Sequence, residues 1–225
     1  LSGADLQRVV CIGEDIPGMQ GTKIENVNSL ALGPSGHAVV ALHWFEGDGG
    51  TMYALSNPDG GLQKILSFGD TASGAPGTFG GSNHFVVSSS GSLMFVGGFS
   101  PEPFVGRSAV LTGSPGNLST RIFETEIRPE VGPGMSVVSQ SIKASMNRSG
   151  QIAYFAELYS EVSKTYAKAI WQGTPGSESL VLQSGETYPG LPPDSFLSSI
   201  GSMWLNNDGV IAFGGQITQT FTNVT

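Results

Sequence analysis

The chain is short of charge, and of positive charge above all. Only 12% of its 225 residues are charged, and 10 Lys and Arg against 18 Asp and Glu leave a net charge of −8. Binding to a phosphate backbone requires clustered Lys and Arg side chains, and the sequence contains no such cluster. The composition therefore predicts that nucleic acid is not a partner.

Cysteine and long apolar runs are also scarce. The single cysteine, Cys11, stands in the apolar run VVCI, so no internal disulfide can form and a buried thiol is expected. No apolar run approaches the roughly 18 residues that cross a bilayer, which predicts no membrane span. The first residues, LSGADLQ, lack the basic and apolar regions of a signal peptide. The chain is therefore expected to be a mature processed product or a piece of a longer protein.

Helical periodicity is missing as well. Short runs rich in Val, Ile, Phe and Thr alternate with turn residues, among them 33 glycines, which is typical of antiparallel strands. Residues 160–169, SEVSKTYAKA, have a helix-friendly composition, but their place between two strand-like runs predicts an extended hairpin. The sequence therefore predicts an all-β fold.

What the sequence does contain is a fourfold repeat. Each copy has a tight turn that ends in glycine between two apolar runs, at Gly36, Gly91, Gly150 and Gly209. Each copy also has a Pro-Gly turn, at Pro17-Gly18, Pro76-Gly77, Pro133-Gly134 and Pro189-Gly190. The turn glycines are 55, 59 and 59 residues apart. A fixed period of this size indicates a solenoid, a propeller or another repeat array.

Four strand-like runs in each repeat predict one blade of a β-propeller. Residues 1–225 are therefore expected to form a single domain, a four-bladed propeller with four antiparallel strands per blade. Six and four residues before each turn glycine, the first strands carry an apolar pair that is expected to pack one sheet against another. The pairs are Leu30 and Leu32, Phe85 and Val87, Ala144 and Met146, and Met203 and Leu205. The second strands are almost continuously apolar and are expected to be buried on both faces.

The two ends of the chain complement each other. Joining FTNVT at the C-terminus to LSGADLQRVVCIGE at the N-terminus gives the same strand, turn, strand and Gly-acid order as the other repeats, and a wrapped interval of 52 residues. We therefore expect N- and C-terminal strands to pair and close the ring, with the seam between Asn223 and Leu6. The pairing occurs either within one chain or between identical units by strand addition.

Two segments carry a family resemblance. Asn206-Asn207-Asp208-Gly209-Val210-Ile211-Ala212-Phe213 and the matching run from Asn147 to Tyr154 resemble repeats of secreted bacterial surface proteins. The chain is also similar to the four-bladed propeller units of glycosylated extracellular fibres. The resemblance implies an extracellular or cell-surface location and a structural role. Repeats one and two depart from it, with GPSG and SSSG where the Asn should stand.

Residues suited to catalysis do not break the symmetry of the repeat. An acid ends the last strand of every copy, at Glu14, Asp70, Glu126 and Glu186, and a group present four times is expected to bind backbone amides rather than to form a glycosidase pair. His37, His43 and His84 lack the spacing of metal ligands, and no nucleophile elbow, phosphate loop or EF-hand loop occurs. We therefore expect no metal, no cofactor and no enzymatic activity.

One position supports a sharper hypothesis. Seven residues before the turn glycines, on the alternate face of the first strands, stand Ser29, His84, Lys143 and Ser202. If that face lines the propeller axis, the four side chains form either a small-ligand or anion site or a hydrated channel lining.

The functional hypothesis is a non-enzymatic extracellular module, a unit of a filament or surface polymer whose partner is itself or identical units. Three Asn-x-Ser/Thr sequences, at Asn117, Asn147 and Asn223, are candidates for attached glycans. The alternatives are a carbohydrate-binding propeller and, less favoured, a glycan-active enzyme.

Overall fold

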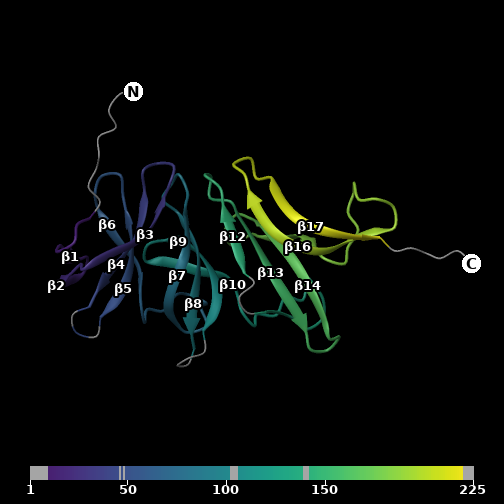
Figure 1. Cartoon of the computed structure of the whole chain (residues 1–225), viewed down its shortest axis with the longest axis horizontal. Coiled ribbons are helices and arrows are strands. Elements are labelled where there is room, and N and C mark those ends of the chain that lie inside the picture. The colour runs from purple at the N-terminus through teal and green to yellow at the C-terminus, as the bar shows by residue number, and fades with distance from the viewer. Residues whose placement is uncertain (1–9, 46, 48, 102–105, 139–141, 220–225) are drawn as a thin grey trace, which may run out of the picture.

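The computed structural model describes residues 10–45, 47, 49–101, 106–138 and 142–219, without the side chains of Ser29, Leu30 and Asn83. Within these residues the protein contains seventeen β-strands and no helix (Figure 1). All strand pairs in its sheets are antiparallel. The all-β fold class expected from the sequence is confirmed.

The first two repeats each form a four-stranded sheet in chain order. The first sheet consists of β3 (Asn26–Leu32), β4 (Ala38–Trp44), β5 (Gly50–Ser56) and β6 (Leu62–Ser67). The second consists of β7 (Thr78–Val87), β8 (Leu93–Ser100), β9 (Arg107–Ser114) and β10 (Asn117–Phe123). A short hairpin of β1 (Asp15–Ile16) and β2 (Met19–Lys23) precedes them. The four strand-like runs of these repeats are therefore real strands.

The third and fourth repeats differ from this plan. In the third sheet, β11 (Met135–Val137) and β12 (Lys143–Met146) both pair with β13 (Ile152–Ser160), which continues to β14 (Thr165–Gly173) and β15 (Ser179–Gln183). Residues 160–169 form the β13–β14 hairpin, as predicted. The fourth sheet has only two strands in the described part of the chain, β16 (Ser195–Leu205) and β17 (Ile211–Gln219).

The repeated glycine turns adopt one conformation and join the repeats together. All four turn glycines have a φ between 80° and 84°. Hydrogen bonds then connect the same turn of successive repeats: Ser35 Oγ donates to the Ser89 carbonyl at 2.6 Å, and the Ser89 amide donates to the Arg148 carbonyl at 3.0 Å. The Arg148 amide donates to Asn207 Oδ1 at 3.1 Å. This row of bonds lines up the four repeats in chain order.

Apolar clusters fill the spaces between neighbouring sheets. In each junction the first-strand residue four places before the turn glycine packs on the preceding sheet, and Val87, Met146 and Leu205 are buried there as predicted. Leu32, the same position in the first repeat, is instead 81% exposed. The β1–β2 hairpin packs on the first sheet through Ile16 and Ile24 but does not cover Leu32.

The second strands show the same end effect. β4 and β13 are buried on both faces over most of their length, as predicted, because another sheet or hairpin covers each side. For β17 the prediction is wrong, since most of its residues are exposed. Within the described residues, neither a third strand nor a following sheet covers it.

The described sheets form an open row and not a closed ring. The first sheet contacts the second, the second contacts the third through β12, and the third contacts β16. Figure 1 shows the β1–β6 region and the β16–β17 sheet at opposite ends of this row. The predicted seam, from Asn223 to Leu6, lies outside the described residues.

Candidate functional site

The repeated acids hold turns. In three repeats the carboxylate accepts a hydrogen bond from the backbone amide three residues earlier: Cys11 to Glu14 at 2.9 Å, Ser67 to Asp70 at 2.7 Å, and Phe123 to Glu126 at 3.0 Å. A charged acceptor at such a turn satisfies an amide that the sheet leaves unpaired. The structural interpretation of these acids is confirmed for three of the four.

The fourth repeat uses a different group. The amide of Gln183, which corresponds to these donors, binds the hydroxyl oxygen of Tyr188 at 2.6 Å. Glu186 Oε1 instead accepts a hydrogen bond from the Gln183 side chain at 3.1 Å. The prediction that Glu186 binds a backbone amide is wrong, because Tyr188 accepts the hydrogen bond from the Gln183 amide.

Glu126 gives a test of pH dependence. Burial raises the pKa of its carboxyl group above the ordinary value, although Arg128 and the Phe123 amide oppose this shift. A carboxyl whose folded pKa is raised ionises more readily in the unfolded chain, so its contribution to folding declines as the pH rises. The decline should begin near the ordinary pKa of glutamate, about 4.3, and end above the raised folded pKa.

We therefore expect Glu126→Gln, which stays neutral, to gain stability relative to the native protein as the pH rises through this window. Urea unfolding followed by circular dichroism from acid to neutral pH measures the difference. Glu161→Gln, on the exposed β13–β14 turn, is the control for loss of a surface carboxylate. A relative loss of stability of Glu126→Gln with rising pH would contradict the prediction.

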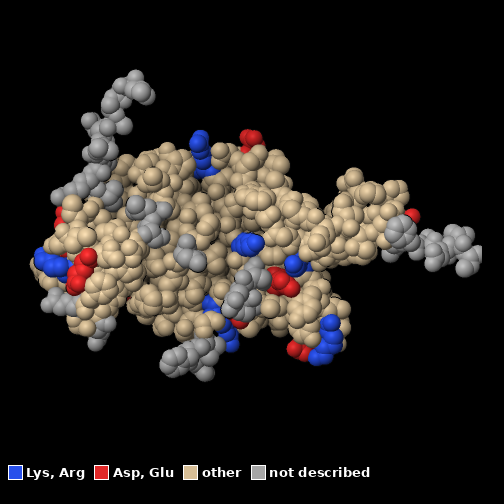
Figure 2. Space-filling model, viewed as in Figure 1, with Lys and Arg blue, Asp and Glu red and all other residues tan. Residues whose placement is uncertain are grey.

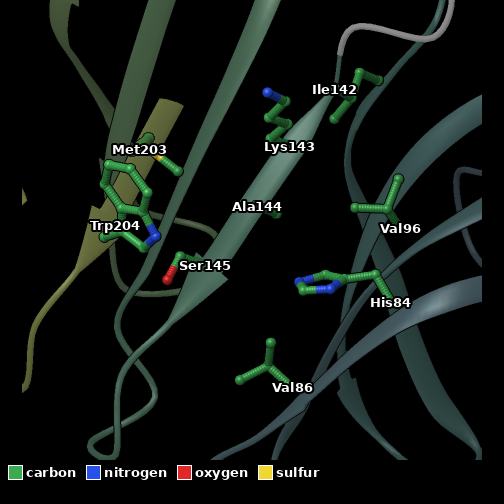
Figure 3. Close-up of a pocket in the computed structure, with 9 residues that line it drawn as sticks. All are labelled: His84, Val86, Val96, Ile142, Lys143, Ala144, Ser145, Met203 and Trp204. Carbon is green, nitrogen blue, oxygen red and sulfur yellow. The ribbon is translucent and has the colours of Figure 1, made fainter. Parts of the chain in front are cut away.

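The alternate face of the first strands does border a shared cavity. It has a volume of about 430 Å³ and is lined by His84 of β7, Lys143 and Ser145 of β12, and Trp204 of β16. Figure 3 shows His84 and Trp204 approaching from opposite sides, with β12 between them. The Lys143 ammonium group also donates to the Gly201 carbonyl of β16 at 3.2 Å. Two of the four predicted residues, His84 and Lys143, are thus brought together.

The other two predicted residues are not part of this lining. Ser202 lies on β16 but does not border the cavity, and the side chain of Ser29 is outside the described residues. The sequence reasoning missed Val86, Ser145 and Trp204, which do line it. All three stand five residues before a turn glycine, one step along the same face, so the repeat itself carried the signal.

The cavity lining offers a cation, an imidazole and an indole ring, and no carboxylate among the described residues. This chemistry suits a small anion or a polar ligand with a flat face. His84, His37 and His43 do not gather, and nowhere in the described part of the chain do three His, Cys, Asp or Glu side chains cluster to hold a metal ion. The small-ligand role of the cavity stays a prediction.

The three glycosylation candidates are not equivalent. Asn117 begins β10 and is exposed. Asn147 is only 4% exposed, and its side-chain amide donates to Gln151 Oε1 at 2.8 Å and to the Asn206 carbonyl at 3.2 Å. A glycan on Asn147 would replace one of the two amide hydrogens that make these bonds and would need space beside a buried side chain, so the fold disfavours that site. Asn223 lies outside the described residues.

Cys11 also differs from its prediction. Its thiol is partly exposed, because the residue lies in an irregular segment before β1 and not inside a covered strand.

Charged side chains are few and scattered over the face in Figure 2, which shows no broad basic patch. The described residues contain no helix able to span a membrane.

The fold and cavity define a class of protein: an all-β protein of successive antiparallel sheets, in which β7, β12 and β16 border a polar and aromatic cavity. The chain belongs to a family described as a family of unknown function (DUF7453), which matches residues 104–225, just over half of the sequence. The match covers β9, β10 and the third and fourth sheets. No curated protein and no solved structure matches the chain.

Proposed function

We propose that the protein is a non-enzymatic structural or interaction module of the extracellular space or cell surface. Its four repeats are the blades of a β-propeller, and the fourth blade is completed by terminal strands of the same chain or of an identical unit. Pairing between units would produce a filament or surface polymer. Asn117 is the described position best suited to carry a glycan on such a polymer.

The observation that carries this proposal is the fourth sheet, which has two strands in the described part of the chain. β17 pairs with β16 on one side, and no described strand covers its other edge. Such an edge presents unpaired amides and carbonyls that readily bind another strand. Three large apolar side chains of this sheet are also exposed, Trp204 by 62%, Ile217 by 52% and Phe213 by 41%. Exposed apolar surface next to a free edge is typical of an interaction site.

The opposite end of the row supplies a matching surface. Leu32 stands where Val87, Met146 and Leu205 each pack on the preceding sheet, and it is exposed. A completed fourth sheet placed before the first one would cover Leu32 in the same way.

The repeated acids support a structural role, since three of them bind backbone amides instead of pairing in a cleft. The location rests on the resemblance to secreted surface repeats.

The third sheet suggests the register that the proposed terminal strands would adopt. Ala169 of β14 pairs with Gln183 of β15. Aligning the Gly-acid steps of the two repeats places Thr222 where Ala169 stands and Cys11 where Gln183 stands. Directly opposed residues have Cβ atoms about 4.5–5.5 Å apart, which lies within reach of a disulfide after small adjustment.

We therefore expect the variant Thr222→Cys to form a disulfide with Cys11 under mild oxidation. Non-reducing gel electrophoresis and intact mass would show a compact monomer if the ring closes on itself, and a ladder of linked chains if neighbouring units exchange strands. The matched control is Phe221→Cys, whose side chain should point to the opposite face of the strand. Equal, slow cross-linking of both variants would overturn the proposed strand pairing.

A further inference from the structure

A second cavity, with a volume of about 570 Å³, lies between the first and second sheets. Its walls include Thr51 and Tyr53 of β5, Phe68 after β6, and Ser82 and Ser108 of the second sheet. This volume is within the usual range of ligand pockets, about 300–1,000 Å³. The cavity is separate from the β16–β17 sheet, so the proposed assembly does not use it.

Glycines create the space. Gly80 and Gly81 of β7 and Gly97 and Gly98 of β8 border the cavity. In the third repeat, Ala156 and Glu157 stand six and seven residues after the turn glycine, where the second repeat has its β8 glycines. The fourth repeat has Gly215 at the first of these positions but Gln216 at the second, so only the second repeat lacks a side chain at both. The glycines alone do not define a ligand, but the groups around them do.

An aromatic face opens onto this cavity. Phe68 is 53% exposed although it borders the wall, and an added Cβ on Gly81 would lie 3.5 Å from its ring. Phe68 also borders an adjoining pocket of about 450 Å³, together with Trp44 and the 67% exposed Phe45. Aromatic rings that border adjoining pockets can each stack against one ring of an extended ligand.

Neutral polar groups stand beside the aromatic rings. Ser108 brings a hydroxyl group, and Thr51 Oγ1 shares a hydrogen bond of 2.8 Å with His43 Nδ1. The other nitrogen of that ring, Nε2, is buried with no hydrogen-bond partner among the described residues. A β-bulge leaves Gly80 without a residue opposite it in the ladder between β7 and β8, which disrupts the local pairing of its backbone polar groups.

Among the described residues, no Lys, Arg, Asp or Glu lines either pocket. An anionic or cationic ligand would therefore lose its hydration without gaining a partner of opposite charge from these described side chains. A ligand that fits must instead offer apolar ring faces and many uncharged hydrogen-bonding groups. We propose that this groove between the first two sheets binds an uncharged oligosaccharide, with Phe68 stacking against a sugar ring and Ser108 and Thr51 near its hydroxyl groups.

The test uses the purified protein and defined tetrasaccharides: cellotetraose, chitotetraose, maltotetraose and mannotetraose, with tetragalacturonate as the charged comparison. Saturation-transfer NMR at about 1 mM sugar, followed by isothermal titration, should detect at least one neutral tetrasaccharide and no binding of tetragalacturonate. Phe68→Ala should weaken that binding about tenfold, and Phe68→Trp should retain it.

Trp204→Ala is the matched control, because Trp204 is an exposed aromatic residue, like Phe68, but lines the other cavity. It should leave sugar binding unchanged. Unfolding curves of all variants establish that each one is folded. The proposal is overturned if no neutral tetrasaccharide binds, if the charged sugar binds best, or if Trp204→Ala abolishes binding while Phe68→Ala does not. Cross-linking of Thr222→Cys is independent of these outcomes, so either proposal can fail alone.

Discussion

Replacing Trp171 with alanine is expected to destabilise the protein by about 3–5 kcal/mol, as for other large aromatic residues in protein cores. Trp171 is 1% exposed and stacks on Tyr154 with ring centroids 5.4 Å apart. Its indole nitrogen donates to Glu130 Oε1 at 3.1 Å, and the Arg128 guanidinium lies 5.4 Å from its ring centroid. Alanine would leave a cavity between the second and third sheets and remove all of these contacts at once.

Urea unfolding followed by far-ultraviolet circular dichroism measures this loss without relying on tryptophan fluorescence. Trp204→Ala is the control, because an exposed side chain should change stability by no more than about 0.5 kcal/mol. If Trp171→Ala does not fold, Trp171→Phe, which keeps most of the apolar volume, should still show a smaller loss. Equal effects of Trp171→Ala and Trp204→Ala would contradict the packing described for the third sheet.

Gly77→Ala is expected to be the most damaging change in the four Pro-Gly turns, with a loss of about 3 kcal/mol. Gly77 has a φ of +125°, which side chains rarely tolerate. A Cβ at this position would also collide with the backbone of Ser100 and Pro101 at the end of β8. Since backbone atoms cannot rotate away, the second sheet would have to shift.

The matched control is Gly190→Ala in the fourth Pro-Gly turn. Gly190 has a φ of +91°, and a Cβ there would meet no atom within 4 Å. Gly190→Ala should therefore lower the free energy of unfolding only by the strain of a left-handed backbone, about 1–2 kcal/mol. Thermal unfolding of the two variants separates strain from collision. A larger drop in melting temperature for Gly190→Ala than for Gly77→Ala would be inconsistent with the structure.

The local elements were predictable because they depend on short-range chemistry. The turns at Gly150 and Gly209 follow from asparagine and glycine within four residues: Asn147 Oδ1 accepts from the Gln151 amide at 2.9 Å, and Asn206 Oδ1 accepts from the Val210 amide at 2.8 Å. Such side chains bind their own backbone whatever surrounds them. The same holds for the acids that bind an amide three residues earlier.

The burial of equivalent residues was not predictable from the repeat. Leu32 and Val87 occupy the same repeat position, yet one is exposed and the other is buried. Val87 is covered by the first sheet, whereas the β1–β2 hairpin leaves Leu32 uncovered, and no local pattern records which element covers a residue. In the same way, β13 is buried because other elements cover it, whereas β17 is exposed because no described element covers it.

The candidate sites divide in the same manner. Face alternation along the first strands was enough to bring His84 and Lys143 toward one cavity. The groove beside Phe68 gave no sequence signal, because its walls come from β4, β5, β7, β8 and β9, which lie far apart in the chain. Only the packing of the first sheet on the second brings the glycines of β7 and β8 to the same groove as the aromatic and hydroxyl groups of the first repeat.

By itself the sequence determined the all-β class, the period of the repeat, the strands and their turns, since these depend on residue type and spacing over a few positions. The tertiary structure decided which repeated residues are buried, which side chains share a cavity, and that no strand of the described residues covers the outer edge of β17. Those properties depend on which sheet lies next to which, and contacts between sheets join residues too distant in the chain for any local pattern to specify.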